Sequence, residues 1–200
     1  MELFTNWHTW QRTEPELRSL LPAADGDAVA RAAEFAIRYH GGQTRPTGAP
    51  YAEHLLEALE VLVLGAGVTD PDILQAAVLH DVVEDTPCTI DDVRREFGAR
   101  VAELVGWVTK PAPEEGSDRT AAKEAYLAHL KDAPDDAVLV KLADRASNVQ
   151  TLRNLAPARQ RSYYAQTVQH IVPLAATEPW FAAWYADWQR DFADLAGPAR

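Results

Sequence analysis

The 200-residue sequence contains one cysteine, Cys88, so it holds neither an intrachain disulfide framework nor a cysteine-based metal cluster. It also lacks an apolar run of about 18 residues, the length that a transmembrane helix needs. The first residues, MELFTNWHTWQRTEPE, have neither the basic start nor the apolar core of a secretory signal. Together these absences predict a cytoplasmic protein with no membrane partner.

Positive charge is scarce as well. The chain carries 19 Lys and Arg against 30 Asp and Glu, a net charge of -11. Because nucleic-acid binding depends on neutralising phosphates with Lys and Arg, we expect no nucleic-acid partner. A small phosphorylated ligand is still compatible with this charge, since a bound cation and a few basic side chains can reverse the field inside a pocket.

The patterning is helical throughout. No segment combines β-branched residues with strict alternation, whereas apolar residues recur at helical spacing, as in the stretch from Asp27 to His40. Asp70 and Pro71 predict the start of a helix that continues through LHDVVED. Thr89 and Asp92 predict a capping box. We expect an all-α fold, one domain over residues 1–200 with about eight to ten helices and no internal repeat.

Residues 109–120, TKPAPEEGSDRT, are the most loop-like stretch, with two prolines, one glycine and mixed charge. Two interpretations stand side by side: a lid over a pocket, or a plain connection.

An aromatic helix is predicted over residues 179–195, where Trp180, Trp184 and Trp188 share one stripe. Packing of this stripe against the rest of the domain is favoured, with Trp7 and Trp10 as its counterpart. The alternative is that the stripe forms the interface of a homo-oligomer.

The segment AAVLHDVVEDT concentrates polar chemistry on an apolar helix. His80 and Glu84 are four residues apart, as are Asp81 and Asp85, and such pairs share a helical face. Grouped carboxylates repel unless a cation offsets their charge, and imidazole with carboxylate suits a divalent metal ion. The alternative is a solvated acidic helix end, which the helix dipole disfavours at a C-terminus.

Two further segments extend this pattern. In AVLVKLADRASNVQTL, Asp144 and Asn148 are four apart and Thr151 follows, which makes a polar strip on an otherwise apolar helix. Taken alone, Asp144 fits a surface ion pair with Lys141 or Arg145 better than a metal site. His54, in GAPYAEHLLEAL, taken alone fits a structural histidine better than a ligand.

In combination, these segments resemble the HD-domain hydrolases, specifically the alarmone hydrolases of the RelA/SpoT homologue family. The resemblance is carried, in order, by YHGGQTRPTGAPYAEH, LHDVVEDT, FGARVAELVGWVTK and VKLADRASNVQTL, within a core of residues 28–176. The chain length resembles that of the small alarmone hydrolases, which lack a synthetase domain.

The resemblance implies a set of site residues and a reaction. It implies a metal site, typically for manganese, made by His54, His80, Asp81 and Asp144. It implies that Glu84 and Asp85 position and activate water, and that the substrate contacts come from Arg45 at the base and from Asn148 and Thr151 at the sugar and phosphates. Lys141 and Arg145 are further candidates for phosphate contact. The implied reaction removes the 3′-pyrophosphate of guanosine tetra- or pentaphosphate, giving GDP or GTP and pyrophosphate.

The sequence departs from the family pattern at three positions. Pro46 replaces a basic residue after Arg45, Leu55 replaces a proline after His54, and Ser147 replaces a histidine after the LADR motif. These changes leave the predicted ligands intact but keep other substrates open, namely an adenine alarmone or NADPH. A third hypothesis is a non-catalytic module that binds a nucleotide or a partner, such as a protein that neutralises a toxic synthetase.

Overall fold

The computed structural model describes residues 1–112, 116 and 118–196. Within these residues all regular secondary structure is helical. One β-bridge, between Thr44 and Pro50, is isolated and belongs to no strand. The all-α prediction is therefore confirmed. A search of the described helices finds none whose length and hydropathy would suffice to span a membrane.

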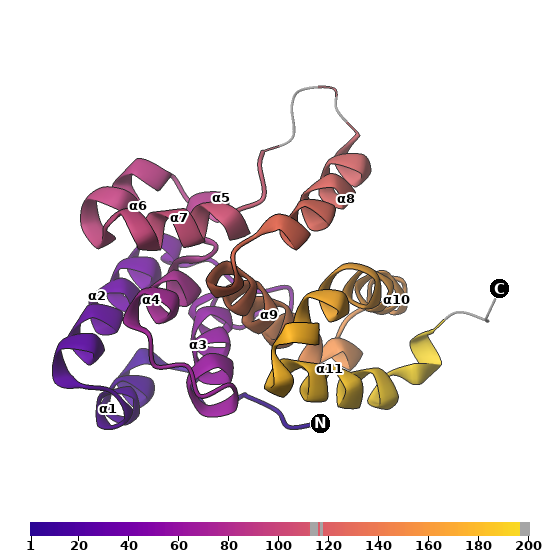
Figure 1. The fold of residues 1–200 in the computed structure, drawn as a ribbon, viewed down its shortest axis with the longest axis horizontal. Coiled ribbons are helices and arrows are strands. Elements are labelled where there is room, and N and C mark those ends of the chain that lie inside the picture. The colour runs from indigo at the N-terminus through magenta and orange to yellow at the C-terminus, as the bar shows by residue number, and fades with distance from the viewer. Residues whose placement is uncertain (113–115, 117, 197–200) are drawn as a thin grey trace.

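The helices follow one another along the chain, most of them with short connections, and the connections before α3 and before α8 are longer (Figure 1). The first part of the chain forms α1 (Trp10–Leu20), α2 (Ala23–His40), α3 (Ala52–Glu60), α4 (Pro71–Leu79), α5 (Val82–Asp85), α6 (Ile90–Phe97) and α7 (Ala99–Val108). The second part forms α8 (Arg119–His129), α9 (Asp135–Gln150), α10 (Pro157–Gln166) and α11 (Pro179–Asp191). Short turns of 3-10 or π type extend several of them, including η1 (Val61–Gly65) after α3 and η6 (Ala193–Leu195) after α11.

Local sequence signals fix several helix ends. The Thr89 hydroxyl accepts from the Asp92 amide and the Asp92 carboxylate accepts from the Thr89 amide, so α6 begins with the predicted capping box. Gly98 ends this helix with a φ of 93°, a conformation that glycine adopts without strain. Asp70 caps α4 as predicted, since its carboxylate accepts from the amides of Asp72 and Ile73.

One predicted helix is wrong in extent. The apolar pattern predicts a continuous helix from Asp70 through Asp85, but α4 ends at Leu79 and α5 begins only at Val82. His80 and Asp81 form the junction between the two helices. The acidic residues therefore lie at the start of α5 and not at the end of a long helix, so the dipole argument against a solvated helix end does not apply as stated.

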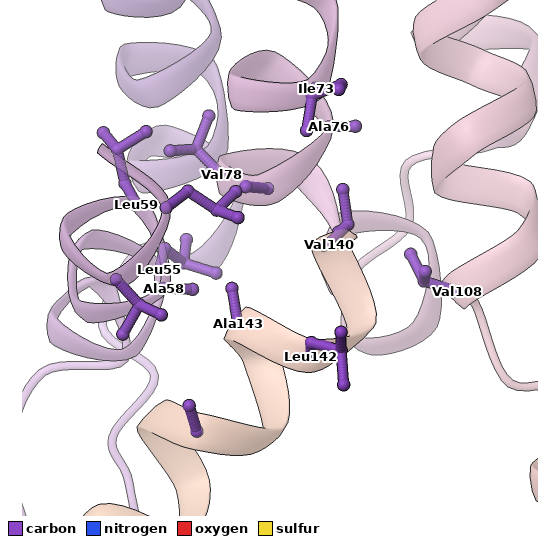
Figure 2. Close-up of a cluster of buried hydrophobic side chains, with 14 of the residues drawn as sticks. Leu55, Ala58, Leu59, Ile73, Ala76, Val78, Val108, Val140, Leu142 and Ala143 are labelled. Carbon is purple, nitrogen blue, oxygen red and sulfur yellow. The ribbon is translucent and has the colours of Figure 1, made fainter. Parts of the chain in front are cut away.

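Helix α9 lies at the centre of the packing. It contacts α3, α4 and α7, and Figure 2 shows their apolar side chains meeting between these helices. Leu59, Val78 and Leu142 are fully buried there. Complete burial of one such side chain stabilises the folded state by about 1.5–3 kcal/mol. The cluster therefore fixes the positions of α3, α4 and α9 relative to one another. These three helices bring the predicted ligands together.

The tryptophan stripe of α11 packs inside the chain. The Trp184 indole donates to the Glu2 carbonyl at 2.9 Å, and the Trp188 indole donates to the Val149 carbonyl at 3.0 Å. Both side chains are buried, and Trp180 is half-buried. The predicted packing against the domain is therefore confirmed, and the homo-oligomer stays a prediction.

The N-terminal segment that meets this stripe includes Phe4, whose ring lies 5.5 Å from that of Trp180. Of the predicted counterpart residues, the Trp7 indole is buried and donates to Glu16 at 3.0 Å, and Trp10 packs against the same apolar core. Helix α1, which contains Glu16, is an element that the sequence analysis does not predict.

The predicted loop over residues 109–120 is partly seen. Lys110 to Ala112 are non-helical, and Asp118 caps α8 by accepting from the amides of Thr120 and Ala121. The lid interpretation falls on residues 113–115 and 117, which lie outside the described residues.

Candidate metal centre and nucleotide pocket

The four predicted ligands converge on one point between α3, α4 and α9. The Nε2 atoms of His54 and His80 are 3.0 Å apart, and Asp81 Oδ2 lies 3.4 Å and 3.1 Å from them. Asp144 Oδ1 lies 3.2 Å from His54 Nε2 and 3.5 Å from His80 Nε2. Both imidazoles are buried. The structure thus joins residues that are separated by up to 90 positions in the sequence.

The hydrogen bonds on the far side of each imidazole set its tautomer. His80 Nδ1 lies 2.6 Å from the Ala77 carbonyl, which only accepts, so Nδ1 carries the proton. His54 Nδ1 lies 2.8 Å from Ser147 Oγ, whose single proton is donated to Glu57. Ser147 therefore accepts from His54 Nδ1, and in the neutral form both Nε2 atoms present lone pairs to the centre.

Two facing lone pairs and two carboxylates make a cluster that requires positive charge. Burial alone raises the pKa of Asp81, but His80 and His54 hold it well below its usual value. Burial alone lowers the pKa of His80, yet Asp81 and Asp144 raise it well above 6.5. The donors are imidazole nitrogen and carboxylate oxygen, with their outer nitrogens fixed by hydrogen bonds, and this set fits a divalent metal ion.

Asp144 forms the predicted ion pair with Lys141, which is buried and does not lie at the surface, and its role as a metal ligand stays a prediction. Its Oδ1 faces the histidines and accepts from Asn148 Nδ2 at 2.7 Å, whereas Oδ2 pairs with Lys141 Nζ at 2.8 Å. Burial raises the pKa of Asp144, but Lys141 and the hydrogen bonds from His54 and His80 lower it far more. The carboxylate therefore stays ionised.

Tyr51 joins the centre to Asp85 and was missed by the sequence analysis. Its hydroxyl lies 2.5 Å from Asp81 Oδ2 and 2.8 Å from Asp85 Oδ2. Its ring stacks on His40, with centroids 4.6 Å apart. His40 in turn contacts Gln43, whose amide donates to the Asp85 carbonyl at 2.8 Å. His40 supports this loop and is not part of the ligand cluster.

Glu84 lines the same pocket but its carboxylate is already engaged. The Lys110 amide donates to Oε2 at 3.0 Å, and the Lys110 ammonium pairs with Oε1. The predicted face-sharing of His80 and Glu84 does not occur, because the helix breaks between them. Asp81 and Asp85 do remain on one side, since both contact the Tyr51 hydroxyl.

A cavity of about 220 Å³ opens next to the ligand cluster. Its wall carries four basic side chains, from Lys110, Lys123, Lys141 and Arg145. Burial, together with Arg145 and Lys110, lowers the pKa of Lys123, which shows how densely positive charge is packed. Of these, Lys110 and Lys123 were not predicted. The same wall carries four carboxylates, from Asp81, Glu84, Asp85 and Asp144, so the formal charges of the cavity balance while the chain as a whole is negative. The four basic side chains give the cavity donors that suit phosphate groups.

A smaller cavity of about 80 Å³ lies beside the first, and Asn148 and Tyr163 line both cavities. Arg45 and Thr151 line it, so the three residues predicted to contact the nucleoside are brought together. Arg45 Nη1 donates to Glu57 Oε2 at 2.9 Å. The smaller cavity, the larger cavity with its four basic side chains and the candidate metal centre therefore adjoin one another. Such an arrangement suits a phosphorylated nucleoside, with room for the nucleoside, for the phosphates and for the reacting bond.

Comparisons with known proteins agree with this geometry. Residues 32–179 match a family model described as HD domain. The chain is 39% identical over 160 residues to the human guanosine-3′,5′-bis(diphosphate) 3′-pyrophosphohydrolase MESH1, across 74% of this chain and 86% of that protein. It is 35% identical over 164 residues to the bifunctional (p)ppGpp synthase/hydrolase SpoT of Escherichia coli (strain K12), across 80% of this chain and 23% of that protein. A solved structure described as a metazoan ortholog of SpoT that hydrolyzes ppGpp matches with a TM-score of 0.74 and 27% identity, across 82% of this chain and 94% of that chain.

Proposed function

This chain belongs to the HD-domain family, and we propose that it removes the 3′-pyrophosphate of guanosine tetra- or pentaphosphate to give GDP or GTP and pyrophosphate. The observation that carries the proposal is the His-His-Asp-Asp cluster, which opens directly into a cavity whose wall carries four basic side chains. Relatives that match across the same region are named for action on this alarmone.

We propose that His54, His80, Asp81 and Asp144 hold Mn²⁺. A divalent cation in this position supplies Lewis-acid chemistry, because it polarises phosphoryl oxygens and eases the deprotonation of water. The chain's own contribution is orientation: both imidazoles are held by hydrogen bonds at Nδ1, and Asp144 is held by Lys141.

The basic side chains of the larger cavity would bind the phosphates. Arg145 and Lys123 lie against the Tyr163 ring, with the guanidinium carbon 5.4 Å and the ammonium 5.5 Å from its centroid. Lys141 gives one N–H to Asp144 and also interacts with the Tyr126 hydroxyl, and an ammonium has three donors, so one remains for phosphate. These charges would stabilise the negative charge that builds on the leaving pyrophosphate.

Glu84 and Asp85 are proposed to position the attacking water and to accept its proton. Asp85 keeps its carboxylate at the cavity wall, where Tyr51 holds one oxygen. Glu84 is paired with Lys110, so it becomes available as a base when a substrate phosphate takes over the Lys110 ammonium. Such a base contributes about 10²–10⁴-fold to the rate.

Arg45, Asn148 and Thr151 are proposed to hold the nucleoside in the smaller cavity. Guanidinium is planar and weakly hydrated, which suits it to stacking on a base. Pro46 lines the same cavity, where the family resemblance leads us to expect a basic residue, so the identity of the base is the part of the proposal that most needs a direct test.

The test is a substrate panel with purified protein and Mn²⁺. Guanosine tetraphosphate, its adenine counterpart and NADPH are supplied in parallel, and products are separated by anion exchange. We expect GDP and pyrophosphate from the guanine alarmone at the highest kcat/KM. His54→Gln should abolish the reaction, whereas His170→Gln, at a histidine that pairs with Glu124 away from the ligand cluster, should retain it. Preferential cleavage of the adenine compound or of NADPH would overturn the substrate assignment.

We further propose that residues 1–200 act as one domain with a core of residues 28–176 and the aromatic helix at 179–195. A cytoplasmic location and the absence of a nucleic-acid partner remain proposals that rest on the sequence, the second on its net charge of -11.

A further inference from the structure

We infer that Glu57 and Ser147 form a positioning pair that joins the metal ligand His54 to the nucleoside-contacting Arg45. The inference deepens the proposed function and rests on it for the role of Arg45. It concerns two residues that the predicted site does not include.

The contacts form an unbroken chain between the two cavities. Arg45 Nη1 donates to Glu57 Oε2 at 2.9 Å, and the Ser147 hydroxyl donates to the same oxygen. Ser147 Oγ lies 2.8 Å from His54 Nδ1. Glu57 is 5% exposed, His54 3% and Ser147 0%, so water competes little for these bonds.

The helices and the loop that carry these four residues explain how the contacts arise. Glu57 stands three residues after His54 on α3, one helical turn away, and Ser147 projects from α9, which packs against α3. Arg45 precedes α3, in the loop that leads into it. Packing of α3 on α9 therefore sets all four positions at once.

Glu57 decides the direction in which the serine hydroxyl points. A hydroxyl has one proton and can rotate, so a free serine could either donate to His54 Nδ1 or accept from it. Because Glu57 only accepts, Ser147 must donate toward it and accept from Nδ1–H. In the neutral imidazole this arrangement leaves Nε2 without a proton and facing the metal centre. A serine that donated to Nδ1 would place the proton on Nε2, where it would block coordination.

The same carboxylate anchors Arg45. It holds one terminal nitrogen of the guanidinium and leaves the other donors and the planar faces for the smaller cavity. Metal binding and nucleoside binding consequently share one buried carboxylate. Loss of the Ser147 hydroxyl should weaken metal binding, whereas loss of the Glu57 charge should weaken both metal binding and nucleoside binding.

The experiment measures two quantities on the full chain: Mn²⁺ affinity by calorimetry without nucleotide, and KM and kcat with the guanine alarmone. Ser147→Ala should weaken Mn²⁺ binding by about 10–100-fold, the usual effect of losing a hydrogen bond behind a ligand, with a smaller change in KM. Ser147→Thr, which keeps the hydroxyl, should restore the affinity. Glu57→Gln should raise KM through Arg45 and weaken Mn²⁺ binding less, because an amide oxygen still accepts from Ser147.

Glu60→Gln is the matched control. Glu60 lies on the same helix, is 1% exposed and accepts from the amides of Asn6 and Trp7, far along α3 from the ligand cluster. It should change thermal stability without changing Mn²⁺ affinity. Folded Ser147→Ala and Glu57→Gln variants with wild-type Mn²⁺ affinity and KM would overturn the inference. If no variant cleaves the alarmone but Ser147→Ala still weakens Mn²⁺ binding, the proposed function fails and the positioning of His54 stands.

Discussion

Removal of the Tyr51 hydroxyl, as in Tyr51→Phe, should slow the reaction without unfolding the chain. The hydroxyl lies 2.5 Å from Asp81 Oδ2 and 2.8 Å from Asp85 Oδ2, and its single proton is shared between these two acceptors as a charge-assisted hydrogen bond. A hydrogen bond to a charged group contributes about 1.5–3 kcal/mol. Since about 1.4 kcal/mol corresponds to a factor of ten, the loss should reduce kcat/KM by roughly 10–100-fold.

The assay separates the two carboxylates that the hydroxyl touches. Loss of the contact to Asp81 should weaken Mn²⁺ binding, and loss of the contact to Asp85 should lower kcat at saturating Mn²⁺. Burial and both carboxylates raise the pKa of Tyr51, so the hydroxyl keeps its proton over the working pH range and the effect should not vary with pH. A Tyr51→Phe variant with unchanged kcat, KM and Mn²⁺ affinity would refute the assignment of Tyr51 to the site.

The remaining predictions concern pH, phosphate binding and stability. The pKa values of His54 and His80 are raised, so Mn²⁺ must displace their protons and its affinity should increase with pH; calorimetry in buffers of different protonation enthalpy would detect the released protons. In the metal-free chain the same shifts stabilise the fold fully below pH 6.5, and this contribution disappears as pH rises through the folded-state pKa values. Lys123→Met should raise KM about tenfold or more by removing a phosphate-binding charge while leaving Mn²⁺ affinity unchanged. Trp188→Ala should lower the free energy of unfolding by about 3–5 kcal/mol in urea, because it empties a fully buried site.

The convergence of the proposed ligands was predictable only from the segments taken together. Apolar periodicity places His54 and Asp144 on helices, and the order of the four segments supplies the combination. From single segments the assignment fails, since Asp144 also fits an ion pair with Lys141, and the structure shows that pair as well. A carboxylate has two oxygens and can satisfy both interpretations.

Other features depend on tertiary packing and left little trace in the sequence. The break at His80 and Asp81 is hidden because the apolar pattern continues through Val82. Lys110 lies near the start of the 109–120 segment and Lys123 lies on α8 beyond it, and only tertiary packing turns both toward one cavity. Tyr51 did carry a usable signal, because it precedes His54 by three residues at the start of the same helix.

The most direct test of the central claim is a manganese titration of metal-stripped protein in the presence of guanosine tetraphosphate, with GDP, pyrophosphate and orthophosphate quantified. We predict that the rate rises with Mn²⁺ to saturation, that GDP and pyrophosphate appear in equal amounts, and that Asp144→Asn removes the response. Hydrolysis that proceeds without added metal, or that releases orthophosphate in place of pyrophosphate, would contradict a metal-dependent 3′-pyrophosphohydrolase built on His54, His80, Asp81 and Asp144.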